Sequence, residues 1–169
     1  MFFSREKRLE NLFDHFLDRG AIEIRLLDIQ ESPKADLAIV ELLVAVLQKL
    51  IKERFISYCM QQEWPEQLLF DILHTAIKDG ENALIANRSY LQLWGLDVST
   101  ALVRDLWQHI FGQVKETLSD ETKQVIQHIL DNGTLSTRIL RAVGNDLSKA
   151  HLRAVYGRLS EVLNNNELF

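Results

Sequence analysis

The sequence predicts a mainly α-helical fold, with one N-terminal β-strand followed by about six helices. Apolar residues recur at three- and four-residue spacing through most of the chain, which is typical of amphipathic helices. Only residues 21–27 alternate with period two. The 169 residues are 47% hydrophobic and 25% charged, as expected of one globular core. We therefore expect residues 1–169 to form a single domain.

The predicted strand at residues 21–27 places acid and base on one face and apolar side chains on the other. Its polar face carries Glu23 and Arg25, and its apolar face carries Ile22, Ile24 and Leu26. A strand needs a ladder partner, and even an isolated two-stranded hairpin is only marginally stable in water. Because no other segment is typical of a strand, we expect its sheet partners in another chain or in upstream sequence.

The first predicted helix runs from Pro33 to about Tyr58. Ser32 is a favourable N-cap and Pro33 a favourable first helical residue, because proline has no amide to leave unbonded there. Glu41 interrupts the most apolar part of this helix and would need a partner if it were buried.

Five further helical regions follow, with signals at their ends. Pro65 and Gly80 bracket the second helix, and Ser99 or Thr100 is expected to cap the third. Ser119 is expected to cap a fourth that ends at Asn132-Gly133. Two shorter segments end near Gly144 and Asn164. The third helix has the most continuous apolar stripe, formed by Leu102, Val103, Leu106, Trp107, Ile110, Phe111, Val114 and Leu118.

Composition excludes several classes of function. The net charge of -5, with no basic stripe, argues against a nucleic-acid partner. Cys59 is the single cysteine, so no intramolecular disulfide forms and a reducing cytoplasm is expected. Residues 1–8 become charged too early for a secretory signal. The apolar run 37–47 is shorter than the roughly 20 residues that cross a membrane, so no membrane partner is expected.

One segment, residues 18–30, carries a pattern that could support chemistry. Glu23 and Arg25 would lie on the same strand face about 7 Å apart, from a rise of about 3.3 Å per residue. The alternative is an ordinary cross-strand ion pair on a solvated face, worth less than about 1 kcal/mol. Residue types alone do not decide between these interpretations.

This segment closely resembles the pattern Gly-x-Ile-Glu-x-Arg-x-x-Asp-x-Gln of the type 2 glutamate–cysteine ligase and carboxylate–amine ligase family. The matching residues are Gly20, Ile22, Glu23, Arg25, Asp28 and Gln30. The resemblance continues through the 33–36 segment and the helix after it. It extends through residues 81–97, which include Asn87-Arg88 and Gly95-Leu96-Asp97, and more loosely through residues 132–138. The similar segments together span residues 18–163.

The resemblance implies that the chain is the helical C-terminal part of an α+β fold, in which an antiparallel sheet surrounds a funnel-shaped site. Upstream segments would supply most of that sheet, so we expect the chain to be inactive by itself. The implied reaction is ATP-dependent: glutamate is phosphorylated on its side-chain carboxylate, and an amine such as cysteine attacks the acyl phosphate. This would be a step of glutathione biosynthesis. ATP and Mg²⁺ are expected only in the complete enzyme.

The resemblance also implies roles for particular residues. Glu23 would hold the metal ion, and Arg25 would stabilise charge on the transferred phosphoryl group as a catalytic residue. Asn87, Arg88 and Arg138 would contact nucleotide or substrate. For Arg88 and Arg138 the alternative is an ion pair on a helix surface. Asp28 and Gln30 match the motif, but they could instead brace the turn after the strand.

Two non-catalytic alternatives remain open. The chain could be a helical interaction module that binds a partner through the edge of its strand. It could also be a dimerisation module in which that strand pairs across a two-fold axis, giving a homo-oligomer.

Overall fold

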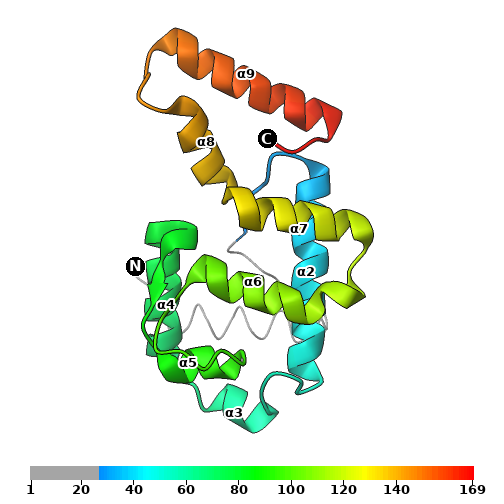
Figure 1. Cartoon of the computed structure of the whole chain (residues 1–169), viewed down its shortest axis with the longest axis vertical. Helices are drawn as coiled ribbons and strands as arrows, with labels where there is room; N and C mark the ends of the chain where they lie inside the picture. Colours follow the sequence, from blue (N-terminus) through cyan, green and yellow to red (C-terminus); the bar gives the residue numbers. More distant parts are fainter. Residues whose placement is uncertain (1–26) are drawn as a thin grey trace, which may run out of the picture.

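The computed structural model describes residues 27–169, and within them the chain is mainly helical, as predicted (Figure 1). The α-helices are α2 (Pro33–Ile51), α3 (Tyr58–Gln62), α4 (Glu66–Asp79), α5 (Arg88–Leu93), α6 (Val103–Val114), α7 (Asp120–Asn132), α8 (Leu135–Val143) and α9 (Lys149–Asn165). Two 3₁₀ turns, η1 (Gly80–Asn82) and η2 (Lys115–Thr117), and two strands, β1 (Leu84–Ile85) and β2 (Ala101–Leu102), complete the elements. The predicted strand at residues 21–27 lies outside the described residues, apart from Leu27, which belongs to no regular element.

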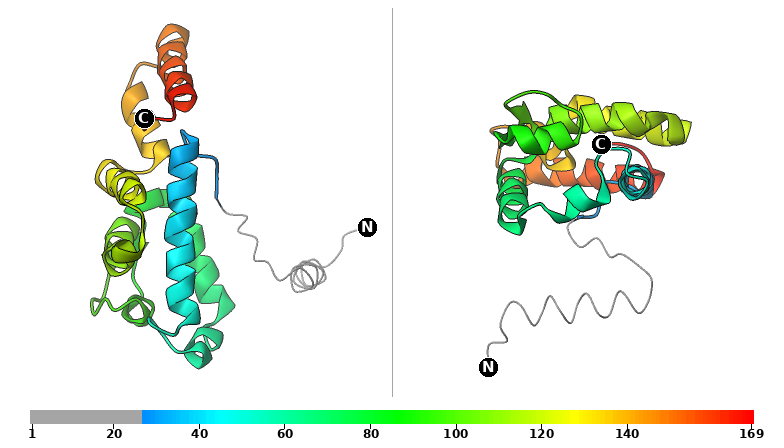
Figure 2. Two further views of the ribbon diagram at one scale, coloured as in Figure 1. Left: turned by 90° about the vertical axis from the view of Figure 1, so that its right-hand side faces the viewer. Right: turned by 90° about the horizontal axis from the view of Figure 1, so that it is seen from below.

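The core forms where α2 packs against α6 and α7 (Figures 1 and 2). The helix α2 lies lengthwise, and α6 and α7 cross it. The third predicted helix is confirmed as α6, and its stripe supplies four buried residues, Leu106, Ile110, Phe111 and Val114. They meet one face of α2, which buries Ala35, Ala38, Leu42, Ala45 and Val46. Each large side chain buried in this way contributes about 1.5–3 kcal/mol.

The helix α2 begins at Pro33 as predicted but ends at Ile51, so the expected end near Tyr58 is wrong. Glu53 adopts a left-handed conformation with φ of 52°. The amide of Arg54 then donates to the carbonyl of Lys49 at 2.8 Å, which closes the helix without a glycine. At the other end, the Ser32 side chain makes no capping hydrogen bond, although Ser32 is the N-cap residue.

The start of α6 also differs from the prediction. Neither Ser99 nor Thr100 caps it, because residues 101–102 form β2 and pair antiparallel with β1. The helix begins at Val103, whose amide donates to the Ala83 carbonyl at 2.9 Å. A two-residue strand pair has too little periodicity to be predicted from sequence.

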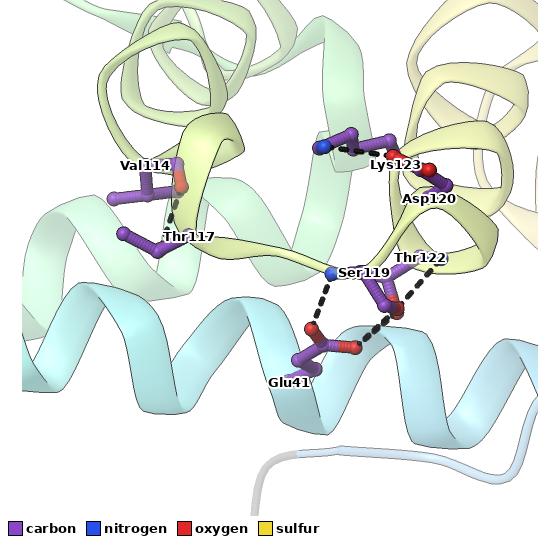
Figure 3. Close-up of polar contacts among 7 residues, drawn as sticks. All are labelled: Glu41, Val114, Thr117, Ser119, Asp120, Thr122 and Lys123. Atoms are coloured by element: carbon purple, nitrogen blue, oxygen red, sulfur yellow. Dashed lines mark hydrogen bonds and ion pairs between the residues drawn. The ribbon is translucent and has the colours of Figure 1, made fainter.

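The Glu41 carboxylate, on α2, accepts hydrogen bonds from residues at the start of α7 (Figure 3). The donors are the Ser119 amide at 2.7 Å, the Ser119 hydroxyl at 2.9 Å and the Thr122 hydroxyl at 2.5 Å. Ser119 in turn caps α7 as predicted, because its Oγ accepts from the Thr122 amide at 3.2 Å. The hydrogen bond from Thr122, and next the Ser119 amide, lower the pKa of Glu41.

The last two helices extend the molecule beyond the core (Figures 1 and 2). The predicted stops at Gly133 and Gly144 are confirmed, and α9 is longer than the short segment expected. After α9 the chain returns toward the start of α2, where the Asn166 side-chain oxygen accepts from the Lys34 amide at 2.8 Å. Within the described residues, no helix is long and apolar enough to cross a membrane.

Candidate functional site

The two residues expected to carry the chemistry, Glu23 and Arg25, lie outside the described residues. The end of their motif is described, and there Asp28 and Gln30 contact only local groups. The Asp28 carboxylate accepts from the Ile29 amide at 2.8 Å, and the Gln30 side chain donates to the Asp28 carbonyl at 2.9 Å. The Gln30 amide donates to Asp36 Oδ1 at 2.9 Å, which ties the segment to the first turn of α2. These hydrogen bonds stabilise the segment of residues 28–30 that precedes α2.

Asn87 and Arg88 have local structural partners. The Asn87 Oδ1 atom accepts from the Tyr90 amide at 3.0 Å and caps α5. The Arg88 guanidinium donates through Nε and Nη2 to Asp97 Oδ1, at 3.1 and 2.8 Å. The side chains of Arg88 and Asp97 are mostly exposed, at 62% and 70%. The hydrogen bond from Arg88, together with one from Gln92, lowers the pKa of Asp97. The geometry at Arg88 is therefore that of a helix-surface ion pair.

Arg138 has a different environment, because its side chain is only 4% exposed. It pairs with Glu31, whose side chain is fully buried, and the distance from Nη1 to Oε1 is 2.5 Å. Its Nε donates to the Gly133 carbonyl at 3.1 Å, and Nη1 also donates to the Phe169 main-chain oxygen at 3.2 Å. The pair joins α8 to the segment immediately before α2. Sequence analysis singled out Arg138 but missed Glu31.

The Gly133–Thr134 turn orients Arg138 and also contacts Glu81. Gly133 has φ of +90°, and a Cβ atom there would lie 2.8 Å from Glu81 Oε1. The Thr134 hydroxyl donates to Glu81 Oε2 at 3.0 Å. Burial raises the pKa of Glu81, but hydrogen bonds, chiefly from Thr137, outweigh it and leave the pKa lowered. Glycine suits this position, because it has no Cβ and tolerates positive φ.

The structure thus brings parts of three distant segments together. Glu31 follows the motif of residues 20–30, Glu81 opens the 81–97 segment, and Gly133 to Arg138 forms the third segment. We call Glu31, Glu81, Gly133, Thr134 and Arg138 the junction cluster. Asn87 and Arg88 do not join it, since α5 and α8 lie toward opposite ends of the molecule (Figures 1 and 2).

Several buried polar atoms at the junction cluster have no hydrogen-bond partner within the described part of the chain. They are Glu31 Oε2, Arg138 Nη2 and, close by in sequence, Ser32 Oγ. Buried polar groups are normally paired, so atoms such as these indicate a place for water, a ligand or another chain. Arg138 Nη2 is a donor suited to a phosphoryl or carboxylate oxygen.

The described residues fit Mg²⁺ poorly. No three His, Cys, Asp or Glu side chains in residues 27–169 are grouped so that they could hold a metal ion. A metal site would therefore require Glu23 and further ligands from elsewhere. Of the predicted nucleotide contacts, Arg138 alone has a buried donor without a partner in this part of the chain.

Comparisons of the chain with protein-family models, with curated proteins and with solved structures give no match. The sequence motifs and the geometry of the described residues therefore carry the functional interpretation.

Proposed function

We propose that this chain is the helical C-terminal part of an ATP-dependent carboxylate–amine ligase similar to glutamate–cysteine ligase. The observation that carries the proposal is the junction cluster. Three segments were singled out by their resemblance to that family, and residues within or adjoining all three are in direct contact. The segments are about 50 positions apart in sequence, so helical periodicity does not account for their meeting.

A second observation supports a role as one part of a larger unit. Opposite its buried face, α2 carries an apolar stripe at helical spacing, formed by Leu37, Val40, Val44 and Ile51, and all four are exposed. Large exposed apolar patches mark surfaces that another element covers. The missing sheet that the resemblance implies would provide such a cover.

In the complete enzyme, ATP would supply the phosphoryl group and Mg²⁺ would neutralise its charge. Glu23 would bind the metal ion, and Arg25 would hold phosphoryl oxygens. Arg138 would orient the segment before α2 through Glu31, and its Nη2 would remain free to bind an anion. Asn87 would contribute by capping α5, and Arg88 by its pairing with Asp97.

The test combines this chain with a polypeptide that supplies the upstream half of such a ligase. We expect ATP-dependent amide formation from glutamate and cysteine by the pair and no formation by this chain alone. Turnover by this chain alone would contradict the proposal that it is only one part of the enzyme. A pair that associates without any ATP-dependent amide formation would contradict the ligase proposal.

Arg25 provides the sharpest variant in that assay. We expect Arg25→Ala to lower turnover by about two or more orders of magnitude, as when a group that stabilises transition-state charge is removed. Arg25→Lys should recover only part of it, because an ammonium cannot hold two oxygens as a guanidinium does. Arg104→Ala is the matched control, since Arg104 lies on the surface of α6 beside Asp105. Full activity of Arg25→Ala would contradict the assigned role.

A non-catalytic interaction module is the second candidate, and a specific observation favours it. The exposed apolar stripe of α2 and the exposed Leu68, Leu69, Phe70 and Ile77 of α4 offer surface for a partner without requiring chemistry. On this hypothesis a partner or a second copy binds the chain, and Arg25→Ala leaves that binding unchanged. The complementation assay separates the two candidates.

A further inference from the structure

We propose that the cavity between α7, α8 and α9 is a binding site for a small anion that carries a phosphate or carboxylate group. The cavity has a volume of about 240 Å³. Its lining includes His128, Asn132, Arg138, Arg141, Arg158 and Phe169. The inference extends the anion-binding role proposed above for Arg138 Nη2, and it is argued from the residues that line the cavity.

The charge of the lining favours an anion. Three arginines line the cavity, and no aspartate or glutamate side chain is among its lining residues. The charge of Arg138 is opposed by Glu31, and its Nη1 also donates to the Phe169 main-chain oxygen, whereas Arg141 and Arg158 are exposed and have no carboxylate partner within the described residues. Their positive charge therefore attracts an anion into the cavity.

Arg138, which lines the cavity, has a buried donor that is not used within the described residues. Arg138 Nε and Nη1 are used by Gly133, Glu31 and Phe169, and Nη2 is buried without a partner in the described part of the chain. Leaving a buried donor unsatisfied is destabilising, and more so when the donor is charged. An oxygen of a bound anion would satisfy it.

His128 supplies a second buried nitrogen among the lining residues. The side-chain nitrogen of Asn132 lies 3.3 Å from His128 Nδ1 and also donates to the His128 carbonyl at 3.0 Å. In the tautomer that accepts at Nδ1, the ring proton is on Nε2. His128 Nε2 is itself buried and has no partner within residues 27–169. Arg138 and His128 thus both line the cavity, and each has a buried nitrogen without a partner within the described residues.

The remaining arginines are suited to enclose the ligand. The Arg158 guanidinium carbon lies 4.3 Å from the centre of the Phe169 ring, and this cation–π contact joins two of the lining residues. Arg141 is one turn beyond Arg138 on α8. The cavity is smaller than the 300–1,000 Å³ typical of sites for drug-sized ligands, so a small metabolite or ion fits best.

The test measures binding of inorganic phosphate and of succinate to the full chain, by calorimetry and by the NMR shift of the His128 ring. We expect saturable binding of at least one probe. Arg158→Gln and Arg141→Gln should weaken it roughly tenfold, because each removes a charge-assisted contact. Arg153→Gln is the matched control, since Arg153 is an exposed arginine of α9 that does not line the cavity, and it should bind as the unaltered chain does.

Arg138→Lys is a further variant that keeps the charge and removes the guanidinium fork, and it should also weaken binding. If it fails to fold, the two surface variants still decide. Tighter binding of phosphate than of succinate would identify a phosphoryl ligand, and the reverse a carboxylate ligand. The proposal is overturned if neither probe binds saturably, or if Arg153→Gln weakens binding as much as Arg158→Gln does.

Discussion

Arg138 and Arg88 both lie on helices and each pairs with one carboxylate, yet their surroundings differ. The Arg138–Glu31 pair is buried, with side chains 4% and 0% exposed, whereas the Arg88–Asp97 pair is mostly in solvent. A buried charge must be compensated, because removing it from water costs several kcal/mol. An exposed ion pair contributes little to the free energy of unfolding, because water already solvates both charges. We therefore expect the buried pair to contribute to the free energy of unfolding, and the exposed pair to contribute little.

The largest effect should follow from breaking the buried pair. We expect Arg138→Ala to reduce the free energy of unfolding by about 3–5 kcal/mol, because it leaves Glu31 buried without its counter-charge. Urea denaturation followed by circular dichroism measures the loss. The double variant Glu31→Leu with Arg138→Met removes both charges and should recover most of it. A loss no larger than that of Arg88→Ala would show that the two pairs are equivalent.

The turn that orients Arg138 should be nearly as sensitive. Gly133→Ala introduces a Cβ at positive φ, 2.8 Å from a Glu81 oxygen and 2.9 Å from Thr137 Cγ2. We expect a loss of about 1–3 kcal/mol, measured by the same denaturation. Gly157→Ala on α9 is the matched control, because a Cβ there meets no atom within 4 Å, and it should be neutral or stabilising. Equal behaviour of the two variants would mean that the turn can relax.

Glu41 gives an intermediate effect that depends on pH. Its pKa is lowered from 4.5 in the folded chain, so its contribution is present above that value and is lost as pH falls through the lowered folded pKa. Glu41→Gln should therefore cost about 1 kcal/mol at neutral pH and almost nothing in strong acid. Thermal unfolding between pH 7 and pH 3 checks this. Glu161→Gln, at an exposed acid of α9, is the matched control variant.

The smallest effect is expected at the exposed pair. Arg88→Ala should leave the melting temperature unchanged within error, because the pair is solvated. It should raise the pKa of Asp97 toward its ordinary value, because the hydrogen bond from Arg88 is the main cause of the lowered pKa. NMR titration of the Asp97 carboxyl measures the change. A marked loss of stability would contradict the contrast between the two ends of the molecule.

Sequence periodicity predicted the helices whose apolar stripes are long and whose ends carry strong signals. The stripe of α6, the Ser119 cap of α7 and the glycine stops at 133 and 144 were all predictable, because each depends on residues within about one helical turn. The end of α2 was not, since Glu53 takes a left-handed conformation that glycine or asparagine usually provides.

The residues of the candidate site were likewise only partly predictable from the sequence. Residue types and a family resemblance singled out Arg138, Asn87 and Arg88 from the sequence, but they gave all three the same kind of role. Tertiary structure alone decided that Arg138 meets Glu31, 107 positions away, and that Arg88 meets a neighbour nine positions away on the surface. Local patterns are set by contacts along one helix, whereas burial of a charge depends on how separate helices pack. No period in the sequence encodes that packing.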